Sequence, residues 1–391
     1  MRDTTHPDWL VGNPSGLSQF SALWMGSAGL LVLGLQPILL GSLFNDGRVT
    51  FDQLALVATV EILCIGLGSV IAAFFFAANA LPVKSAILLI ALIVFNGITA
   101  YSGDPVMLTL WRTIAGLLEG GLVAISVELI ARSRQPERFG GYFVTLQTGL
   151  QCLSALILSQ WVVPFYGSKG GFVALACFCA LSLSFVRSVP EAYGAVEKTE
   201  STDSGKAHAL LPVLALLTIF CFYLFLGALW AFLEPLGGQS GISATVIGLM
   251  VSLSLLSQLV GAVLATWAER RIDYRLVLFA AGLTAAAIAS ILAFQPGLVL
   301  FWICVLAIGF IWLFVVPYQI ALTIVADENR KTALLVPAAQ LFGAAIGPVG
   351  ASLFLQGADV QPVPIFAGGA ALASLVFLTG FIVVLRSVSK A

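Results

Sequence analysis

Apolar residues occur along the chain in long blocks, and short polar segments separate one block from the next. A block of about 20 mostly apolar residues is long enough to cross a lipid bilayer as an α-helix. Applied to the whole chain, this length predicts twelve membrane spans. They cover residues 20–44, 53–77, 84–101, 106–130, 139–165, 170–186, 210–236, 246–268, 275–294, 298–326, 332–355 and 363–385.

The polar segment 187–209 is longer than the others and divides the predicted spans into two sets of six. It carries many charged residues and few large apolar ones, as flexible linkers do. We therefore expect an all-α polytopic membrane protein. An N-terminal six-helix bundle over residues 1–186 and a C-terminal six-helix bundle over 210–391 are joined by a cytoplasmic linker over 187–209.

Basic residues are distributed unevenly between the two ends of the predicted spans. With both termini on one side, 15 of the 18 Lys and Arg residues fall on that side, Arg48 and Lys169 fall on the other, and Arg112 lies within a span. Cytoplasmic loops of membrane proteins are enriched in Lys and Arg. The sequence therefore predicts cytoplasmic N and C termini in a multi-pass protein of the bacterial cytoplasmic (inner) membrane.

The overall composition agrees with this prediction, because 60% of the residues are apolar and only 9% are charged. A soluble domain has about 25% charged residues, so this chain lacks the charge to cover a water-exposed surface. The low charge also excludes a disordered chain and a nucleic-acid-binding protein that relies on a basic patch. The six cysteines lie in apolar blocks and the two histidines in polar segments, so we expect no metal, no other cofactor and no enzymatic site.

Short stretches of the two halves are similar in sequence, which is typical of transporters built from repeats. Residues 68–72 of the second span resemble residues 261–265 of the eighth. The alignment pairs Glu61 with Ser254, Arg112 with Val305, Gly116 with Gly309 and Glu119 with Trp312. The first half therefore carries charges where the second half carries small or aromatic residues.

Several motifs resemble those of the major facilitator superfamily. Residues 265–275, after the eighth span, are similar to that family's cytoplasmic signature of a small residue, an acid and spaced basic residues, and this resemblance implies a gating loop with Glu269, Arg270 and Arg275. Residues 108–116 resemble the family's buried arginine motif. The loop 77–84 lacks the acid and most basic residues of the signature, and the fifth span lacks the Gly-Pro motif of proton-driven drug exporters. The resemblance implies two six-helix bundles that rock around a site near the membrane midplane.

Four ionisable residues lie inside predicted spans, namely Glu61, Arg112, Glu119 and Glu234. A charge in the hydrocarbon core costs roughly 2.5–3.5 kcal/mol on insertion scales, so such residues face the bundle interior and mark functional sites. A rise of about 1.5 Å per residue places Glu61 and Arg112 at similar depths, with Glu119 two turns beyond Arg112 on the same face. A carboxylate beside an arginine gains or loses a proton as the arginine changes partners. We expect a proton-coupling site here, with Glu234 near its outer mouth; a fixed Glu61–Arg112 bridge that orders the bundle is the structural alternative.

Uncharged polar and aromatic residues in the spans suggest the lining of a cargo site. In the resembled family the first, fourth, seventh and tenth helices line the central cavity. An amide can hydrogen-bond a solute while an indole packs against its apolar part, although glutamines also join helices to each other. The expected cargo-binding residues are Arg112, Gln36, Gln147, Gln151, Trp230, Trp312, Tyr318 and Gln319.

The sequence thus predicts a proton-coupled secondary transporter of a small organic solute. Arg112 favours a solute with a carboxylate or another anionic group, and the missing Gly-Pro motif favours uptake by symport. Two alternatives stay open: a proton-antiport exporter of lipophilic or cationic compounds, and a receptor of the same fold that does not transport. The expected partners are the solute, protons and the lipid bilayer, with no nucleic acid, and the protein is expected to act as a monomer.

Overall fold

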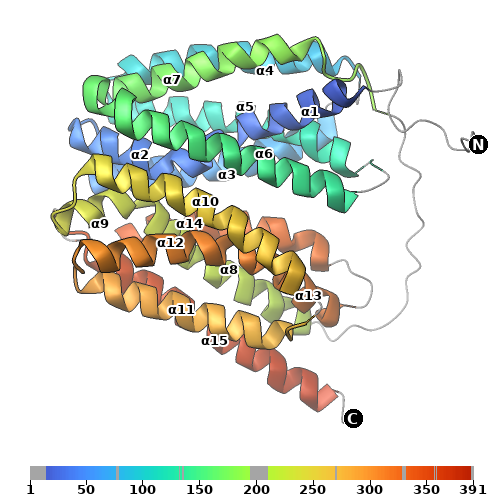
Figure 1. Cartoon of the computed structure of the whole chain (residues 1–391), viewed down its shortest axis with the longest axis vertical. Coiled ribbons are helices and arrows are strands. Elements are labelled where there is room, and N and C mark those ends of the chain that lie inside the picture. The colour runs from blue at the N-terminus through green and yellow to red at the C-terminus, as the bar shows by residue number, and fades with distance from the viewer. Residues whose placement is uncertain are drawn as a thin grey trace, which may run out of the picture.

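The computed structural model describes residues 15–75, 79–131, 133, 136–193, 210–268, 271–327, 332–355, 357 and 359–388. Within these residues the chain folds into helices that lie roughly side by side along one direction (Figure 1), and an isolated β-bridge joins Asn79 and Ala192. The predicted all-α fold is therefore confirmed.

The described residues of the first half form seven α-helices and one π-helical turn. They are α1 (Gly16–Gly29), α2 (Leu31–Asn45), α3 (Phe51–Phe75), α4 (Leu81–Tyr101), α5 (Pro105–Ala131), α6 (Pro136–Ile157), the π turn η1 (Leu158–Val162) and α7 (Val163–Val186). Those of the second half form eight α-helices and one 3₁₀ turn. They are α8 (Leu210–Ala231), α9 (Leu233–Gln239), α10 (Ala244–Ala268), α11 (Tyr274–Ala293), α12 (Leu298–Phe314), α13 (Val316–Ala326), the 3₁₀ turn η2 (Thr332–Leu335), α14 (Val336–Ser352) and α15 (Pro362–Val388).

Nine described helical segments are long and apolar enough to cross a membrane, and the bent pair α12 and α13 makes a tenth. One of the nine, Arg138–Val186, contains 49 residues. The chain reverses within it, because Gly167 has a non-helical backbone and Gly171 packs against Leu158, which a straight helix would place about 20 Å away. α14 is another apolar helix but has only 17 residues. The reversal and α14 make the structure compatible with the twelve predicted spans.

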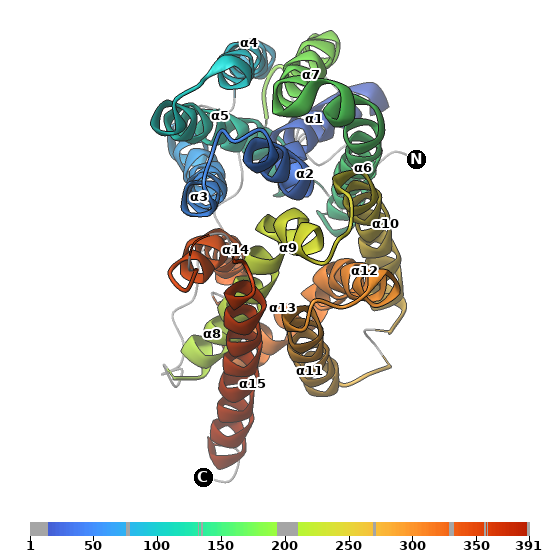
Figure 2. The ribbon, with the colours of Figure 1, turned by 90° about the vertical axis from the view of Figure 1, so that its left-hand side faces the viewer.

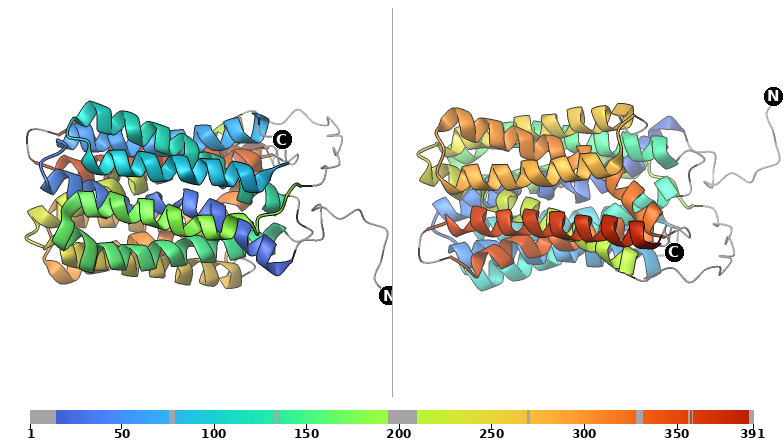
Figure 3. Two further views of the ribbon diagram at one scale, coloured as in Figure 1. Left: turned by 90° about the horizontal axis from the view of Figure 1, so that it is seen from above. Right: turned by 90° about the horizontal axis from the view of Figure 1, so that it is seen from below.

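The helices form two bundles (Figure 2), with α1–α7 in one and α8–α15 in the other. α3 packs on α5 within the N-terminal bundle, and α10 packs on α12 within the C-terminal one, while the bundles meet where α3 contacts α14 and α6 contacts α10. Outward faces keep large apolar side chains exposed, such as Ile87 and Val263, as lipid-facing helices require. α1 begins and α15 ends at the same end of the molecule (Figures 1 and 3), which we call the terminal end; the opposite end is the distal end.

Contacts between the bundles follow an approximate two-fold symmetry. Residues 193 positions apart are equivalent, so Thr59 corresponds to Ser252 and Cys152 to Ala345. Thr59 donates through Oγ1 to the Ala345 carbonyl at 2.6 Å, and Cys152 donates through its thiol to the Ser252 carbonyl at 3.2 Å. The two hydrogen bonds therefore join equivalent pairs of positions, one on each side of the symmetry axis. The repeat seen in short sequence stretches thus extends to the packing of the helices.

The start of the predicted linker differs from the flexible segment that we expected. The Leu81 amide donates to the Glu191 carbonyl at 3.2 Å, and the Tyr193 hydroxyl donates to the Ile125 carbonyl of α5 at 2.7 Å. Tyr193 is only 5% exposed, so its apolar ring fixes residues 187–193 to the N-terminal bundle. The remainder of the predicted linker, residues 194–209, lies outside the described residues.

Candidate functional site

A cluster of ionisable side chains lies inside the N-terminal bundle. Arg112 on α5 forms ion pairs with Glu61 on α3 and with Glu119, whose Oε1 lies 3.2 Å from Arg112 Nη2. Asn96 on α4 accepts a hydrogen bond from Arg112 Nη1 at 2.7 Å, and the ring of Phe172 on α7 lies 5.3 Å from the guanidinium carbon. Four helices of one bundle therefore meet around a single arginine.

Glycine brings the two helices that carry these charges together. A Cβ atom at Gly116 would collide with the Glu61 carbonyl, and one at Gly120 would collide with the Ile65 carbonyl. The two glycines are one helical turn apart, so they form a smooth strip on α5 along which the backbone of α3 can lie. This close approach places Glu61 directly opposite Arg112, which is one turn before Gly116.

The cluster is enclosed in this conformation. Arg112 has no exposed surface, and Glu61 and Glu119 are 2% and 5% exposed. Among the described residues, the buried Oε2 atom of Glu119 has no hydrogen-bond partner. Two carboxylates and one guanidinium carry one net negative charge when all are ionised, and one bound proton makes the cluster neutral. Because burial favours the neutral form, the arrangement can hold one proton.

Glu234 lies apart from this cluster, at the distal end. The candidate membrane span of this region ends at Ala231, so Glu234 lies beyond it and not inside a span as the sequence predicted. Glu234 on α9 accepts a hydrogen bond from Asn45 Nδ2 at the end of α2, at 2.5 Å, and it packs against Gly41. Burial raises the pKa of Glu234 to about 8; the hydrogen bond from Asn45 lowers it, and the charge of Asp46 raises it. Glu234 thus belongs to the contact between the two bundles.

The N-terminal residues expected to line a cargo site differ in their exposure. Gln151 on α6 is 3% exposed and donates through Nε2 to the Leu30 carbonyl at 2.7 Å. Gln36 on α2 is also 3% exposed, with Nε2 3.5 Å from the Ala58 carbonyl. Gln147 on α6 is half-buried. Gln151 therefore satisfies a backbone carbonyl at the break between α1 and α2, a role that its spacing in the sequence did not reveal.

The C-terminal residues of the same prediction lie around an aromatic cluster. The ring of Trp312 is nearly perpendicular to that of Trp230, with centroids 5.3 Å apart, and Trp312 is half-buried. Tyr318 is buried, and its ring lies 5.6 Å from that of Phe314. Gln319 accepts a hydrogen bond from Gln340 Nε2 at 2.9 Å. The polar and aromatic side chains of this region are therefore two amides that bond to each other and a set of packed rings.

Solved structures with the same fold cover nearly the whole chain. The nucleoside transporter NupG superposes with a TM-score of 0.69 at 15% sequence identity, over 93% of this chain and 99% of its own. A bacterial homologue of the human lysosomal transporter Spinster, in an inward-facing and unoccupied conformation, gives 0.71 at 13% identity, over 95% and 97%. The xylose transporter XylE from E. coli gives 0.65 at 12% identity, over 92% and 98%.

Residues 215–391 match the family model described as Major Facilitator Superfamily. This match covers the C-terminal half of the chain, and the structural similarity extends over the N-terminal half as well. No curated protein matches the chain in sequence. The three superposed proteins are named as transporters, in line with the expectation of a transporter rather than an enzyme.

Two of the three residues of the expected major facilitator gating loop, Glu269 and Arg270, lie outside the described residues. The third, Arg275, is at the start of α11, where its amide donates to Asp273 Oδ1 at 2.7 Å and its Nε donates to the Tyr274 hydroxyl at 3.0 Å. Asp273 therefore caps α11.

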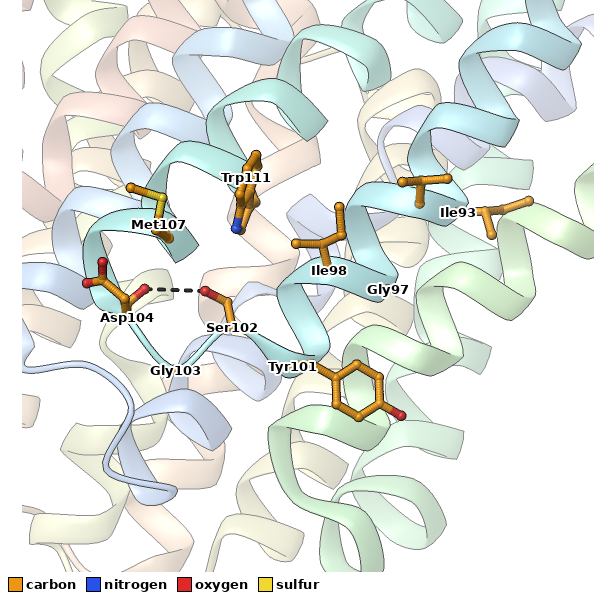
Figure 4. Close-up of a pocket in the computed structure, with 10 residues that line it drawn as sticks. Ile93, Gly97, Ile98, Tyr101, Ser102, Gly103, Asp104, Met107 and Trp111 are labelled. Carbon is orange, nitrogen blue, oxygen red and sulfur yellow. Dashed lines mark hydrogen bonds between the residues drawn. The ribbon is translucent and has the colours of Figure 1, made fainter.

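A groove of about 670 Å³ lies at the distal ends of α4 and α5 (Figure 4). It is lined by side chains such as Ile98, Tyr101, Met107 and Trp111, and Ser102 Oγ donates to the Asp104 carbonyl at its rim, at 3.4 Å. The groove is formed by α4, α5 and the loop between them, so it lies outside the contact between the two bundles.

Proposed function

We propose that this chain is a proton-coupled secondary transporter that moves a small organic solute by alternating access. The observation that carries the proposal is the sharing of one buried arginine, Arg112, between two buried carboxylates, Glu61 and Glu119. Such a charged cluster is costly in a membrane protein unless the charges are used. Similarity to a transporter family over residues 215–391, and to transporter structures over nearly the whole chain, supplies the context in which a proton site has a use.

The cluster offers a simple coupling step. With one proton bound it is neutral, and without that proton it carries one buried negative charge. A conformational change that moves Arg112 away from either carboxylate makes the proton on that carboxylate more strongly held, because the nearby positive charge is lost. Proton binding and bundle movement are thereby linked through the position of one side chain, as reciprocal coupling requires.

The contacts between bundles indicate which movement is needed. Asn45 meets Glu234 at the distal end, and Thr59 and Cys152 meet carbonyls of the opposite bundle nearer the middle. These contacts close the distal side in the described conformation. Rocking of the bundles would break them and open a path from that side towards Trp312, with Gln319 and Gln340 further along α13 and α14 towards the terminal end.

The charge of the cargo follows from the same geometry. The expectation of an anionic solute rests on Arg112, whose guanidinium is fully buried, with its two Nη groups held by two carboxylates and Asn96, so an anionic solute would have to displace one of these partners. Among the described residues, the buried Nε of Arg112 has no hydrogen-bond partner. We therefore propose an uncharged polar solute, recognised by the amide and aromatic side chains between the bundles. The printed names of NupG and XylE, transporters of nucleosides and xylose, indicate suitable first compounds. A cargo carboxylate that displaces Glu61 from Arg112 is the competing possibility.

The proposed setting is the cytoplasmic (inner) membrane of a bacterium, with the terminal end in the cytoplasm and the protein acting as a monomer. Basic residues are concentrated in the loops of the terminal end, as the sequence shows. With this orientation the distal end faces outward, so protons and cargo would enter together from the outside in symport.

The test uses purified protein in sealed vesicles. Nucleosides, pentoses, carboxylates, amino acids and lipophilic amines are first screened by the rise in melting temperature that a bound ligand causes. The stabilising compound is then supplied outside vesicles with an inward pH gradient. Coupling to one proton supports up to tenfold accumulation per pH unit, because each tenfold ratio corresponds to about 1.4 kcal/mol.

Matched variants identify the proton site. Glu61→Gln and Glu119→Gln should abolish gradient-driven accumulation while cargo exchange without a gradient persists. Asp52→Asn, an exposed carboxylate on the same helix as Glu61, is the control and should accumulate cargo like the parent. Unchanged accumulation in both glutamine variants would reject the cluster as the proton site, and accumulation driven by an outward gradient would favour antiport export.

A further inference from the structure

The first span contains a carbonyl that its own helix cannot satisfy. In an α-helix the carbonyl of one residue accepts a hydrogen bond from the amide four positions later. Pro37 lies within α2 and has no amide hydrogen, so the Leu33 carbonyl lacks its helical donor. Trp230 of α8 supplies a donor instead, with its indole Nε1 2.9 Å from the Leu33 oxygen. The missing bond of one bundle is therefore made by the other bundle.

The surroundings fix Trp230 in this position. It is 2% exposed, and its ring is nearly perpendicular to that of Trp312, at 84° and with centroids 5.3 Å apart. Trp312 is held in turn by Tyr223 in a second perpendicular contact, at 6.5 Å. The indole is thereby oriented by Trp312 of its own bundle, which Tyr223 holds in turn, and its N–H group reaches across to the N-terminal bundle.

A second carbonyl close by provides a comparison. α1 ends at Gly29, and the Leu30 carbonyl at the break before α2 accepts a hydrogen bond from Gln151 Nε2 at 2.7 Å. Gln151 belongs to the same bundle as Leu30, so movement of the two bundles relative to each other leaves that bond intact. The bond to the Leu33 carbonyl, in contrast, breaks whenever α8 moves away from α2.

Two of the other hydrogen bonds between the bundles use acceptors that depend less on a partner from the opposite bundle. The Ala345 carbonyl that accepts from Thr59 lies within α14, where the amide of Val349 is in position to satisfy it. Glu234 and Asn45 meet at the distal end, beside a cavity of about 180 Å³. Loss of these bonds leaves the acceptor another partner, whereas loss of the Trp230 bond leaves a polar group in an apolar setting.

We propose that the Trp230–Leu33 hydrogen bond is the latch that holds the distal end closed, and that Pro37 is present to create its acceptor. The inference rests on the proposed alternating access, because a latch has a purpose only if the bundles separate. It makes Trp230 a positioning residue of the transport cycle, in addition to any contact with cargo.

The test measures the separation of the bundles directly. Spin labels are placed at the exposed distal residues Asp104 and Gln295, one on each bundle, in full-length protein whose six cysteines have been replaced, in lipid nanodiscs. Trp230→Phe keeps an aromatic ring and removes the donor. We expect it to raise the ratio of distal-open to distal-closed molecules roughly tenfold, as loss of a partner by a buried carbonyl implies.

Trp24 provides a matched control. Its indole Nε1 donates to Ser182 Oγ, also at 2.9 Å, but both residues belong to the N-terminal bundle. Trp24→Phe therefore removes a bond of the same kind and length without touching the interface, and the distance distribution should stay that of the parent. An equal shift in both variants would show that the effect is a general loss of packing, and it would overturn the proposal.

Pro37→Ala tests the second half of the proposal. Alanine restores the amide that the Leu33 carbonyl lacks, so the bond from Trp230 becomes redundant. In this background Trp230→Phe should change the open-to-closed ratio less than twofold, and a tenfold change in both backgrounds would reject the role of Pro37. If Trp230→Phe does not fold, Pro37→Ala alone decides, because it should shift the distribution towards the open form and an unchanged distribution contradicts the latch.

The readout separates this inference from the proposed function. It needs neither cargo nor a pH gradient, so a protein that shows the latch but fails to accumulate any solute would reject proton-coupled transport alone. A protein that accumulates solute while Trp230→Phe leaves the distances unchanged would reject the latch alone.

Discussion

The two bundles contain the same helix crossing, made with different chemistry. In the N-terminal bundle α3 and α5 cross where Glu61 pairs with Arg112. In the C-terminal bundle α10 and α12 cross at the equivalent residues, where Ser254 Oγ donates to the Val305 carbonyl at 2.8 Å. Glycine permits the close approach in both, since a side chain at Gly309 would collide with the Ser254 carbonyl just as one at Gly116 would collide with that of Glu61.

The comparison shows what the fold itself requires. A glycine on one helix and a small polar residue on the other are sufficient to make this crossing, as the C-terminal bundle demonstrates. The charges of the N-terminal bundle are therefore additional to packing. Buried ion pairs contribute little net stability compared with apolar residues of similar volume. Their presence in only one bundle is best explained by a task that this bundle performs alone.

Removal of the arginine should have the largest effect on stability. Arg112→Val copies the C-terminal residue but leaves Glu61 and Glu119 buried without their cation. We expect it to lower the free energy of unfolding by about 3–5 kcal/mol, the usual cost of breaking a buried ion pair. Reversible unfolding in mixed detergent micelles measures this change.

The matched variant removes all three charges. Glu61→Ser, Arg112→Val and Glu119→Gln together imitate the uncharged crossing of the other bundle and leave no buried ion alone. The triple variant should lose less than half as much stability as Arg112→Val, while gradient-driven transport disappears. If the triple variant is the less stable of the two, the charges are needed for folding and the comparison fails.

The sequence anticipated part of this arrangement. Blocks of apolar residues predicted the helices, and the short match between residues 68–72 and 261–265 gave the same offset that the helix contacts follow. Helical spacing placed Arg112 and Glu119 on one face and at a depth that suits Glu61. Local periodicity is sufficient for these features, because each depends on residues of one helix or on a repeat of the chain.

Partners from other helices were not predictable. Asn96 and Phe172 complete the surroundings of Arg112, but they come from α4 and α7, and no spacing along the chain relates them to α5. Trp230 was expected to face cargo, yet its indole binds a carbonyl of the opposite bundle. The proline that frees this carbonyl was visible in the sequence, whereas the donor could be found only after the bundles were placed together.

Asn96 also differs from its equivalent in the C-terminal bundle, which is the buried apolar residue Ala289. Asn96→Ala removes an acceptor from a buried guanidinium, and hydrogen bonds to charged groups contribute about 1.5–3 kcal/mol. We expect a loss of stability in that range in the parent. In the triple variant, which has no arginine, the same substitution should have almost no effect, and an equal loss in both would show that Asn96 acts through packing alone.

A second charge difference between the halves lies at the distal end and should have a smaller, pH-dependent effect. Glu234 of the C-terminal half corresponds to Gly41 of the N-terminal half, and the two residues pack against each other. Burial raises the pKa of Glu234 to about 8 in the closed form, against an ordinary value of 4.5. The closed form therefore binds the proton more tightly than an open form in which water reaches the carboxyl group. Its advantage is full below about pH 4.5 and is lost as the pH rises towards 8.

Between pH 7 and pH 8 the ratio of closed to open molecules should fall roughly fivefold, as the linkage for this pKa requires. Distance measurements across the distal end at several pH values report the ratio. Glu234→Gln should remove the dependence, and Asp52→Asn, an exposed acid at the same end, should retain it. A dependence that survives in Glu234→Gln would assign it to another group.

The smallest effect is expected at the C-terminal crossing itself. Ser254→Ala removes the hydroxyl that reaches the Val305 carbonyl, but that carbonyl lies within α12, where the amide of Gly309 is placed to satisfy it. The loss should be about 0.5 kcal/mol, at the lower limit for a neutral hydrogen bond whose acceptor keeps another partner. Unfolding measurements on Ser254→Ala and Arg112→Val under the same conditions therefore compare two equivalent helix crossings. Similar losses of stability would mean that the Glu61–Arg112 pair and the Ser254–Val305 pair both serve packing. A several-fold larger loss for Arg112→Val would mean that the charged crossing is easily destabilised. Because the C-terminal bundle makes the same crossing without charges, the fold itself does not require them.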